Sequence, residues 1–142
     1  NIADGTLLSI LTIIINLKNS NEFTYLLNRV GHFSTFENLI SFGLHLGSGI
    51  KGAIGSNLKV DFTYLSPNVN ISSRFQSLTK SYGVTVIFSD DLFKLLSHKF
   101  QIICRLIDII KVKGSKRRIQ IYTLDVCLKK NKSKFNFSKI QL

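Results

Sequence analysis

The sequence predicts an α/β fold of the α+β sandwich type, with helices packed on a mainly antiparallel sheet. The 142 residues are 44% hydrophobic, which is enough for one domain with a real core. Apolar residues recur at helical spacing near the start of the chain. Short apolar runs bounded by glycine follow and alternate with helix signals. These three observations indicate a single layered domain.

The first predicted element is a helix over about residues 3–17, where leucine and isoleucine recur at intervals of three and four. Its apolar run over residues 7–17 has 11 residues, short of the roughly 20 that a membrane-spanning helix needs. We therefore expect a buried helix. A polar excursion over residues 19–38 should follow, with a short helix near Tyr25 and Leu26.

Three strands are expected next, over residues 39–47, 49–56 and 59–65. Their short connections predict an antiparallel meander. Ser66 and Pro67 then signal a helix start, because a serine hydroxyl can accept from a free backbone N–H and proline has none to leave unpaired.

The helix that starts at Pro67 should run to about Lys80 and end by Gly83. Ser89 is expected to cap a later short helix that has Asp90 and Asp91 in its first turn. The remaining predicted elements are a strand, that short helix and two closing strands, over residues 84–88, 89–96, 101–110 and 118–126.

Positive charge is concentrated late in the chain. Of the 19 Lys and Arg residues, ten follow Ile110, against Asp125 as the single acid. Residues 128–142 hold five lysines and no acid, which predicts a basic extension after a domain of residues 1–127. This end could attract nucleic acid or an anionic membrane, but the interleaved aromatic and basic residues of an RNA-binding sheet are missing.

Cys104 and Cys127 lie 23 residues apart, without a Cys-x-x-Cys pair or a Cys/His cluster. This pattern indicates neither a zinc site nor a disulfide framework, so an intracellular setting is the default. The chain starts at Asn1 with no readable signal peptide, and we expect it to be part of a longer protein.

Asn70 and Arg74 are four residues apart on the helix predicted after Pro67, so they project from one face, a turn apart. Both lie near the helix N-terminus, where free N–H groups stabilise an anion. Arginine can grip phosphate oxygens with two parallel hydrogen bonds. The pair suits a phosphate ester beside a sugar hydroxyl. The alternative is an ordinary surface amide and surface charge.

Four segments around this pair occur in a characteristic order: GLHLG at 43–47, GAIG at 52–55, DFT at 61–63, and VN at 69–70 followed by Arg74. Together they resemble the core of class III nucleotidyl cyclases, the adenylate and guanylate cyclase catalytic domains. The later VKGSKRRIQIYTLD also looks like the closing turn and strand of that family. The likeness covers about residues 39–125 well and the first helix weakly. It implies a ferredoxin-like cyclase homology domain whose N-terminal part is missing here.

The resemblance implies conversion of a nucleoside triphosphate to a 3′,5′-cyclic nucleotide and pyrophosphate. By this likeness Asn70 orients the ribose, and Arg74 stabilises charge that grows on the α-phosphate. Lys113 matches a lysine that holds the terminal phosphates, although an ordinary basic turn explains it equally well. Thr63 falls where the family reads the purine edge, and it favours ATP over GTP.

The family also uses two Mg²⁺ or Mn²⁺ ions, held by two aspartates of an earlier strand and hairpin. Nothing similar precedes the first helix here, so we expect residues outside this chain to bind the ions. A purine-selecting lysine of the same region is also absent, and Ser66 and Ser72 replace a usual glycine and alanine. The resemblance further implies a second cyclase homology domain as partner, in a homodimer or heterodimer. A larger assembly at the cytoplasmic side of a membrane or in a cilium is expected.

Two alternatives to catalysis stay open. The chain could be a non-catalytic cyclase-like regulatory or scaffold domain, or a nucleic-acid-binding domain that uses its basic end. His45, between two leucines of a predicted strand, is expected to be structural, since an isolated histidine in a sheet has no nucleophile to serve. Asp90 and Asp91 are expected to act as charges at a helix start.

Overall fold

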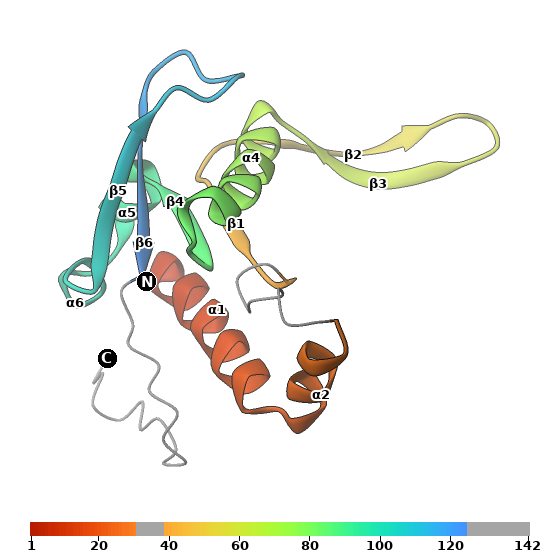
Figure 1. Ribbon diagram of the computed structural model, residues 1–142. Coiled ribbons are helices and arrows are strands. Elements are labelled where there is room, and N and C mark those ends of the chain that lie inside the picture. Colours follow the sequence, from red (N-terminus) through yellow and green to blue (C-terminus); the bar gives the residue numbers. More distant parts are fainter. Residues whose placement is uncertain (31–38, 125–142) are drawn as a thin grey trace.

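The computed structural model describes residues 1–30 and 39–124 (Figure 1). The described elements are, in chain order, α1 (Ile2–Asn19), α2 (Asn21–Val30), β1 (Phe42–Leu44), β2 (Ile50–Gly55), β3 (Val60–Leu65), α4 (Pro67–Tyr82), β4 (Val86–Ser89), α5 (Asp90–Leu95), α6 (His98–Gln101), β5 (Cys104–Ile110) and β6 (Ile119–Leu124). The predicted basic extension, Cys127 and part of the predicted polar excursion lie outside the described residues. The domain boundary at residue 127 therefore stays a prediction.

A four-stranded sheet in the order β1-β4-β6-β5 forms the centre of the fold. β1 runs parallel to β4, whereas β4 with β6 and β5 with β6 are antiparallel. The expected α/β fold with a mainly antiparallel sheet is confirmed.

Helices cover both faces of this sheet because successive side chains of β4 point to opposite sides. Val86 and Phe88 belong to one buried cluster, which also contains residues of α1, α5 and α6. Ile87 belongs to a second cluster, which contains Ile71 and Phe75 of α4. The sheet therefore places α4 on the face opposite α1.

α1 has the expected position, but only one of its faces is buried where a buried helix was expected. Its inner face, which includes Leu7, Ile10 and Ile14, is part of the core. Among the described residues, α1 is also the one helix long and apolar enough to cross a bilayer, although 33% of it is buried inside the fold. A core helix passes the same test of length and composition, and the packing of Leu7 (0% exposed) fits that role.

The predicted three-stranded meander is wrong in its first strand. β1 covers only Phe42–Leu44 and pairs in parallel with β4, Phe42 lying opposite Val86. β2 and β3 instead form a separate two-stranded hairpin that projects from the body of the molecule (Figure 1). A parallel pair needs a long crossover, here supplied by β2, β3 and α4, and local spacing in the sequence does not reveal such a pairing.

α4 starts and ends as the sequence predicts. The Ser66 side chain accepts a hydrogen bond from the backbone N–H of Asn68, and Pro67 occupies the first turn. Gly83 ends the helix in the left-handed region at φ 63°, which glycine adopts without a Cβ clash.

Two other predicted boundaries need correction. α2 is a ten-residue helix where a mostly irregular excursion with a short helix was expected. Residues 101–110 are not one strand, because α6 includes Gln101 and β5 begins only at Cys104. The Gln101 amide donates to the carbonyls of Phe93 and Leu96, at 3.2 and 3.1 Å, which draws this segment back onto α5.

Candidate active site

Asn70 and Arg74 are both exposed on α4, one turn apart. Each is followed by a buried residue, Ile71 at 4% and Phe75 at 0% exposure, so the core fixes the helix while the two polar groups remain in solvent. Within the described residues, no hydrogen bond or ion pair engages either side chain. The structure therefore brings this predicted pair together, available to a ligand.

The N-terminal end of α4 is tied to the segment between β1 and β2. The carbonyl of Ser48 accepts two hydrogen bonds, from the Ser66 hydroxyl at 2.6 Å and from the Asn68 amide at 2.9 Å. A Cβ on Gly47 would overlap the Asn68 side chain, and a Cβ on Gly43 would overlap the backbone of α4. The glycines of GLHLG thus let β1 and the chain after it lie directly against α4.

His45 lies beneath this contact and joins β1 to the end of β4. Its Nδ1 shares a 2.9 Å hydrogen bond with the Ser89 hydroxyl, and its ring meets Phe75 edge-on at 5.8 Å between centroids. Burial lowers the pKa of His45 from its ordinary value, against an opposing effect of the Asp91 charge and the Asn68 side chain. The environment fits the expected structural role.

Ser89 does not cap α5 as the sequence predicts. It occupies the N-cap position, but its side chain makes no capping hydrogen bond. Its hydroxyl is fully buried and bonded to His45 instead. The competing partner, His45, lies 44 residues earlier, just after β1, and a local capping rule does not take such a distant residue into account.

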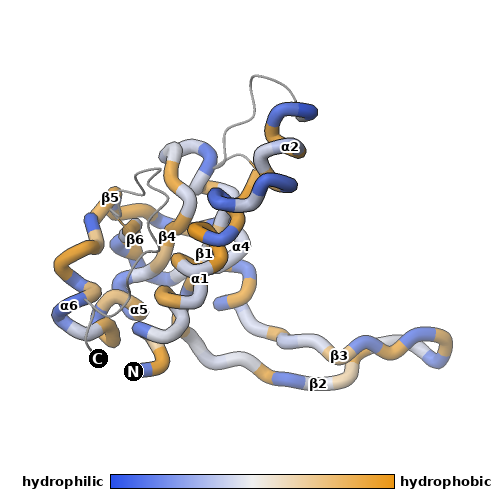
Figure 2. Tube along the Cα trace, turned by 90° about the horizontal axis from the view of Figure 1, so that it is seen from below, coloured by the Kyte–Doolittle hydropathy of each residue, from blue (hydrophilic) through white to orange (hydrophobic). Residues whose placement is uncertain are grey.

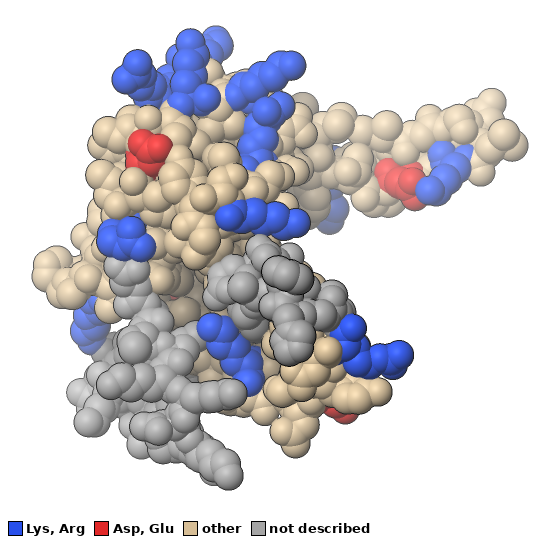
Figure 3. Space-filling view, in the orientation of Figure 1, with Lys and Arg blue, Asp and Glu red and all other residues tan. Residues whose placement is uncertain are grey.

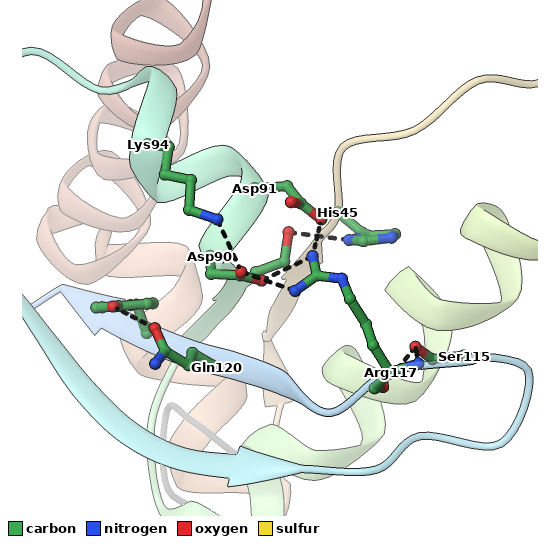
Figure 4. Close-up of polar contacts among 9 residues, drawn as sticks. His45, Asp90, Asp91, Lys94, Ser115, Arg117 and Gln120 are labelled. Carbon is green, nitrogen blue, oxygen red and sulfur yellow. Dashed lines mark hydrogen bonds and ion pairs between the residues drawn. The ribbon is translucent and has the colours of Figure 1, made fainter.

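Asp90 and Asp91, predicted as helix-start charges, also bind Arg117 (Figure 4). The guanidinium reaches both oxygens of Asp90, at 2.9 and 3.2 Å, and one oxygen of Asp91 at 2.5 Å. Lys94 donates to Asp90 at 3.2 Å. Burial alone would raise the pKa of Asp90, but the hydrogen bonds from Arg117 and Lys94 outweigh burial and lower it.

Lys113 is exposed on the turn between β5 and β6, which we call the basic turn (residues 111–118). Gly114 has φ 101°, and the N–H of Ser115 donates to the carbonyl of Val112 at 2.9 Å. Val112 is buried in the same cluster as Ile71 and Phe75. The turn that carries Lys113 is therefore anchored beside α4.

Thr63 stands apart from this arrangement. It is exposed on β3, opposite Gly52 of β2, in the projecting hairpin. No described contact links it to the other predicted site residues, although the chain passes from β3 directly into α4.

In the part of the chain that the structure describes, no three His, Cys, Asp or Glu side chains gather in a way that could hold a metal ion. Asp90 and Asp91 face a guanidinium instead. The described residues therefore do not fit a two-metal site.

The model of the adenylate and guanylate cyclase catalytic domain family matches residues 15–126 of this sequence. The chain belongs to this family. The GLHLG, GAIG, DFT and VN segments, together with Arg74, all lie within the match.

Curated relatives of this cyclase domain include an adenylate cyclase of Anabaena cylindrica, 34% identical over 84 residues. Adenylate cyclase 1 of Rhizobium meliloti is 28% identical over 81 residues. These alignments cover 58% and 57% of this chain but only 17% and 12% of the relatives. The chain thus spans a small part of the length of the proteins that it matches.

Two solved structures of a bacterial light-regulated adenylyl cyclase have a similar fold, with TM-scores of 0.62 and 0.63 and 25% identity. Each superposition covers 87% of this chain and 33% of the other. The fold is therefore that of part of a cyclase homology domain.

Proposed function

We propose that this cyclase domain contributes to the conversion of a nucleoside triphosphate, ATP in preference to GTP, to a 3′,5′-cyclic nucleotide and pyrophosphate. The observation that carries the proposal is the pair Asn70 and Arg74, exposed one turn apart on a helix fixed by its buried face. Thr63 supports the preference for ATP through the resemblance alone.

In the proposed reaction the ribose 3′-oxygen forms a bond to the α-phosphorus, and the bond from that phosphorus to the oxygen bridging the β-phosphate breaks. The 3′-hydroxyl gives its proton to solvent water, and pyrophosphate leaves. Asn70 holds the ribose so that its 3′-oxygen faces the phosphorus. Arg74 directs its guanidinium at the α-phosphate oxygens, where negative charge grows in the transition state. Lys113 binds the terminal phosphates.

The metal ions of the family are proposed to be held outside the described residues, by another segment or by a partner domain. When bound, such ions neutralise phosphate charge and activate the attacking hydroxyl. Asn70 and Arg74 would then complete a site whose acidic residues come from elsewhere.

The hairpin of β2 and β3 supports the proposal of a second cyclase homology domain as partner. Val60, Phe62 and Tyr64 alternate along β3 and so share one face, at 61%, 76% and 61% exposure. Apolar residues recur along the hairpin in Figure 2. An isolated two-stranded hairpin is marginally stable in water, so this face needs a cover. Thr63 lies on the opposite face of β3, and a cyclase partner that covers the apolar face would also lie near the start of α4, which follows β3 directly.

The test of catalysis is Arg74→Ala in the full-length protein, assayed for cyclic nucleotide from ATP and from GTP. We expect kcat to fall about 10²–10³-fold with little change in KM, because the guanidinium acts mainly in the transition state. Lys80→Ala, which removes an exposed cation from the same helix, is the matched control. Equal turnover of wild type and Arg74→Ala would remove Arg74 from the mechanism.

A non-catalytic regulatory or scaffold role is the second candidate, since the described residues do not supply a metal-binding cluster. Nucleotide binding without cyclic product by the full-length wild type would favour it. The location at the cytoplasmic side of a membrane or in a cilium stays a prediction.

A further inference from the structure

Arg117 makes an ion-pair cluster that the proposed reaction does not use. Its guanidinium contacts Asp90 with two nitrogens and Asp91 with one (Figure 4). The Asp90 side chain is only 7% exposed, whereas that of Arg117 is 50% exposed. A forked contact to a buried carboxylate is stronger and geometrically better defined than an ordinary surface ion pair. We call Arg117, Asp90 and Asp91 the clamp.

The clamp joins two elements that are distant in sequence. Asp90 and Asp91 begin α5, directly after β4, and Arg117 lies 27 and 26 residues later at the far end of the basic turn. The near end of the turn is anchored by Val112, buried at 6% exposure in the cluster with residues of α4. Lys113 lies between these two anchors.

Within the turn itself, few contacts hold Lys113 in place. Ser115 donates its N–H to Val112 and its hydroxyl to the Arg117 carbonyl, at 2.9 and 2.7 Å. Gly114 lies in the left-handed region of the backbone, where glycine has no Cβ to restrict it. The far end of the turn is held to the rest of the domain by the clamp at Arg117 and by Ile119, which pairs with Ile110 and is 1% exposed.

The clamp also explains which cation is available to a ligand. Arg117 is matched by two carboxylates, so an added phosphate would meet a guanidinium that is already paired. Lys113 is exposed, and no hydrogen bond or ion pair joins it to another described side chain. Lys and Arg side chains gather at this end of the molecule in Figure 3.

We propose that Arg117, held by Asp90 and Asp91, is a positioning residue that sets the conformation of the basic turn so that Lys113 meets the terminal phosphates of the substrate. This inference rests on the proposed function. Arg117 acts through the turn and does not itself touch the substrate.

The first measurement is hydrogen exchange across residues 111–118 in the full-length protein, which reports local opening without any need for catalysis. We expect Arg117→Gln to speed exchange roughly tenfold in the turn, while α4 and β6 remain protected. Asp91→Asn leaves both hydrogen bonds from the Arg117 guanidinium to Asp90 intact, so it should increase the exchange rate of the turn less than Arg117→Gln does. Arg118→Gln removes the neighbouring charge and should leave exchange unchanged.

The single variant Arg117→Gln leaves the buried Asp90 with Lys94 as its remaining cation. Where that variant fails to fold, Asp90→Asn combined with Arg117→Gln removes both charges and tests the same contact. Arg117→Lys should restore protection only in part, because an ammonium group lacks the planar fork.

The second measurement is steady-state kinetics on the same proteins. Arg117→Gln should raise KM for the triphosphate about as much as Lys113→Ala does, with kcat nearly unchanged, and the double variant should be no worse than Lys113→Ala alone. Arg118→Gln should leave both constants unchanged.

Unchanged exchange in Arg117→Gln would overturn the proposal, because the clamp would then not fix the turn. Faster exchange with an unchanged KM in Arg117→Gln would overturn the link to Lys113. The same conclusion would follow if the effects of Arg117→Gln and Lys113→Ala on KM were additive in the double variant. If the wild-type protein forms no cyclic product, the proposed function is contradicted. The role of the clamp in fixing the turn is tested separately by hydrogen exchange, which does not need catalysis.

Discussion

Single residues of this domain divide into those that local spacing explains and those that only distant partners explain. The spacing of Asn70 and Arg74 predicted that both lie on one face of a helix, and the structure places both in solvent on α4. Arg117 contacts Asp91 and Asp90, which lie 26 and 27 residues earlier in the sequence. From the local sequence alone, Arg117 was therefore identified only as part of a basic turn. One indication of the partners of Arg117 was present in the sequence: Asp90 and Asp91 are adjacent acidic residues at a predicted helix start.

His45 should make stability depend on pH. Its pKa lies below the ordinary value of 6.5 because of burial, so the folded state binds a proton less readily than the unfolded chain. The contribution of neutral His45 to the free energy of unfolding is therefore fully present above pH 6.5. It is lost as the pH falls through the pKa that His45 has in the folded state, which is the lower of the two. Asp90 and Asp91 oppose this shift, and Arg117 adds to it.

We expect the melting temperature to fall between pH 7 and pH 5, and to fall less in His45→Asn, which cannot titrate. Thermal denaturation at several pH values checks the slope, and NMR titration of the imidazole gives the pKa itself. A His45 pKa at or above the ordinary value would contradict the expected direction.

At the scale of elements, helix starts and turns were predictable, whereas strand pairing was not. Ser66, Pro67 and Gly83 delimit α4 through local chemistry. The partner of β1 is β4, which follows only after the hairpin and α4. Pairing of that kind depends on which apolar faces can be buried together, and spacing along the chain does not contain this information.

The β2–β3 hairpin should be an association surface. Phe62→Asp places a charge on the face that it shares with Val60 and Tyr64, and we expect the dissociation constant of the dimer to rise about 30-fold or more, as for an aromatic residue central to an interface. Sedimentation equilibrium measures the constant, and circular dichroism checks the fold. Leu58→Asp, beyond the paired residues at the tip, is the control. Equal dissociation constants for wild type and Phe62→Asp would exclude this face from the interface.

At the scale of the whole molecule, the described residues place Asn70 and Arg74 in solvent on α4 and form no cluster of three or more His, Cys, Asp or Glu side chains that could hold a metal ion. In the full-length protein, chelation should abolish cyclic nucleotide formation, and Mg²⁺ or Mn²⁺ should restore it. The melting temperature of the 142-residue chain should change little on addition of either ion, because a ligand stabilises only a state that binds it. A large rise in that temperature would show that this chain itself holds an ion.

The sequence by itself determined the mixed fold, the ends of α4 and the shared face of Asn70 and Arg74, because helix capping and helical periodicity act over a few residues. Its ordered glycine, histidine and arginine segments also determined the family. Only the tertiary structure decided that β1 joins β4, that Ser89 binds His45, and that Arg117 holds Asp90 and Asp91. These contacts form when buried faces and charges from distant segments meet, and their free energies depend on burial that no local pattern specifies.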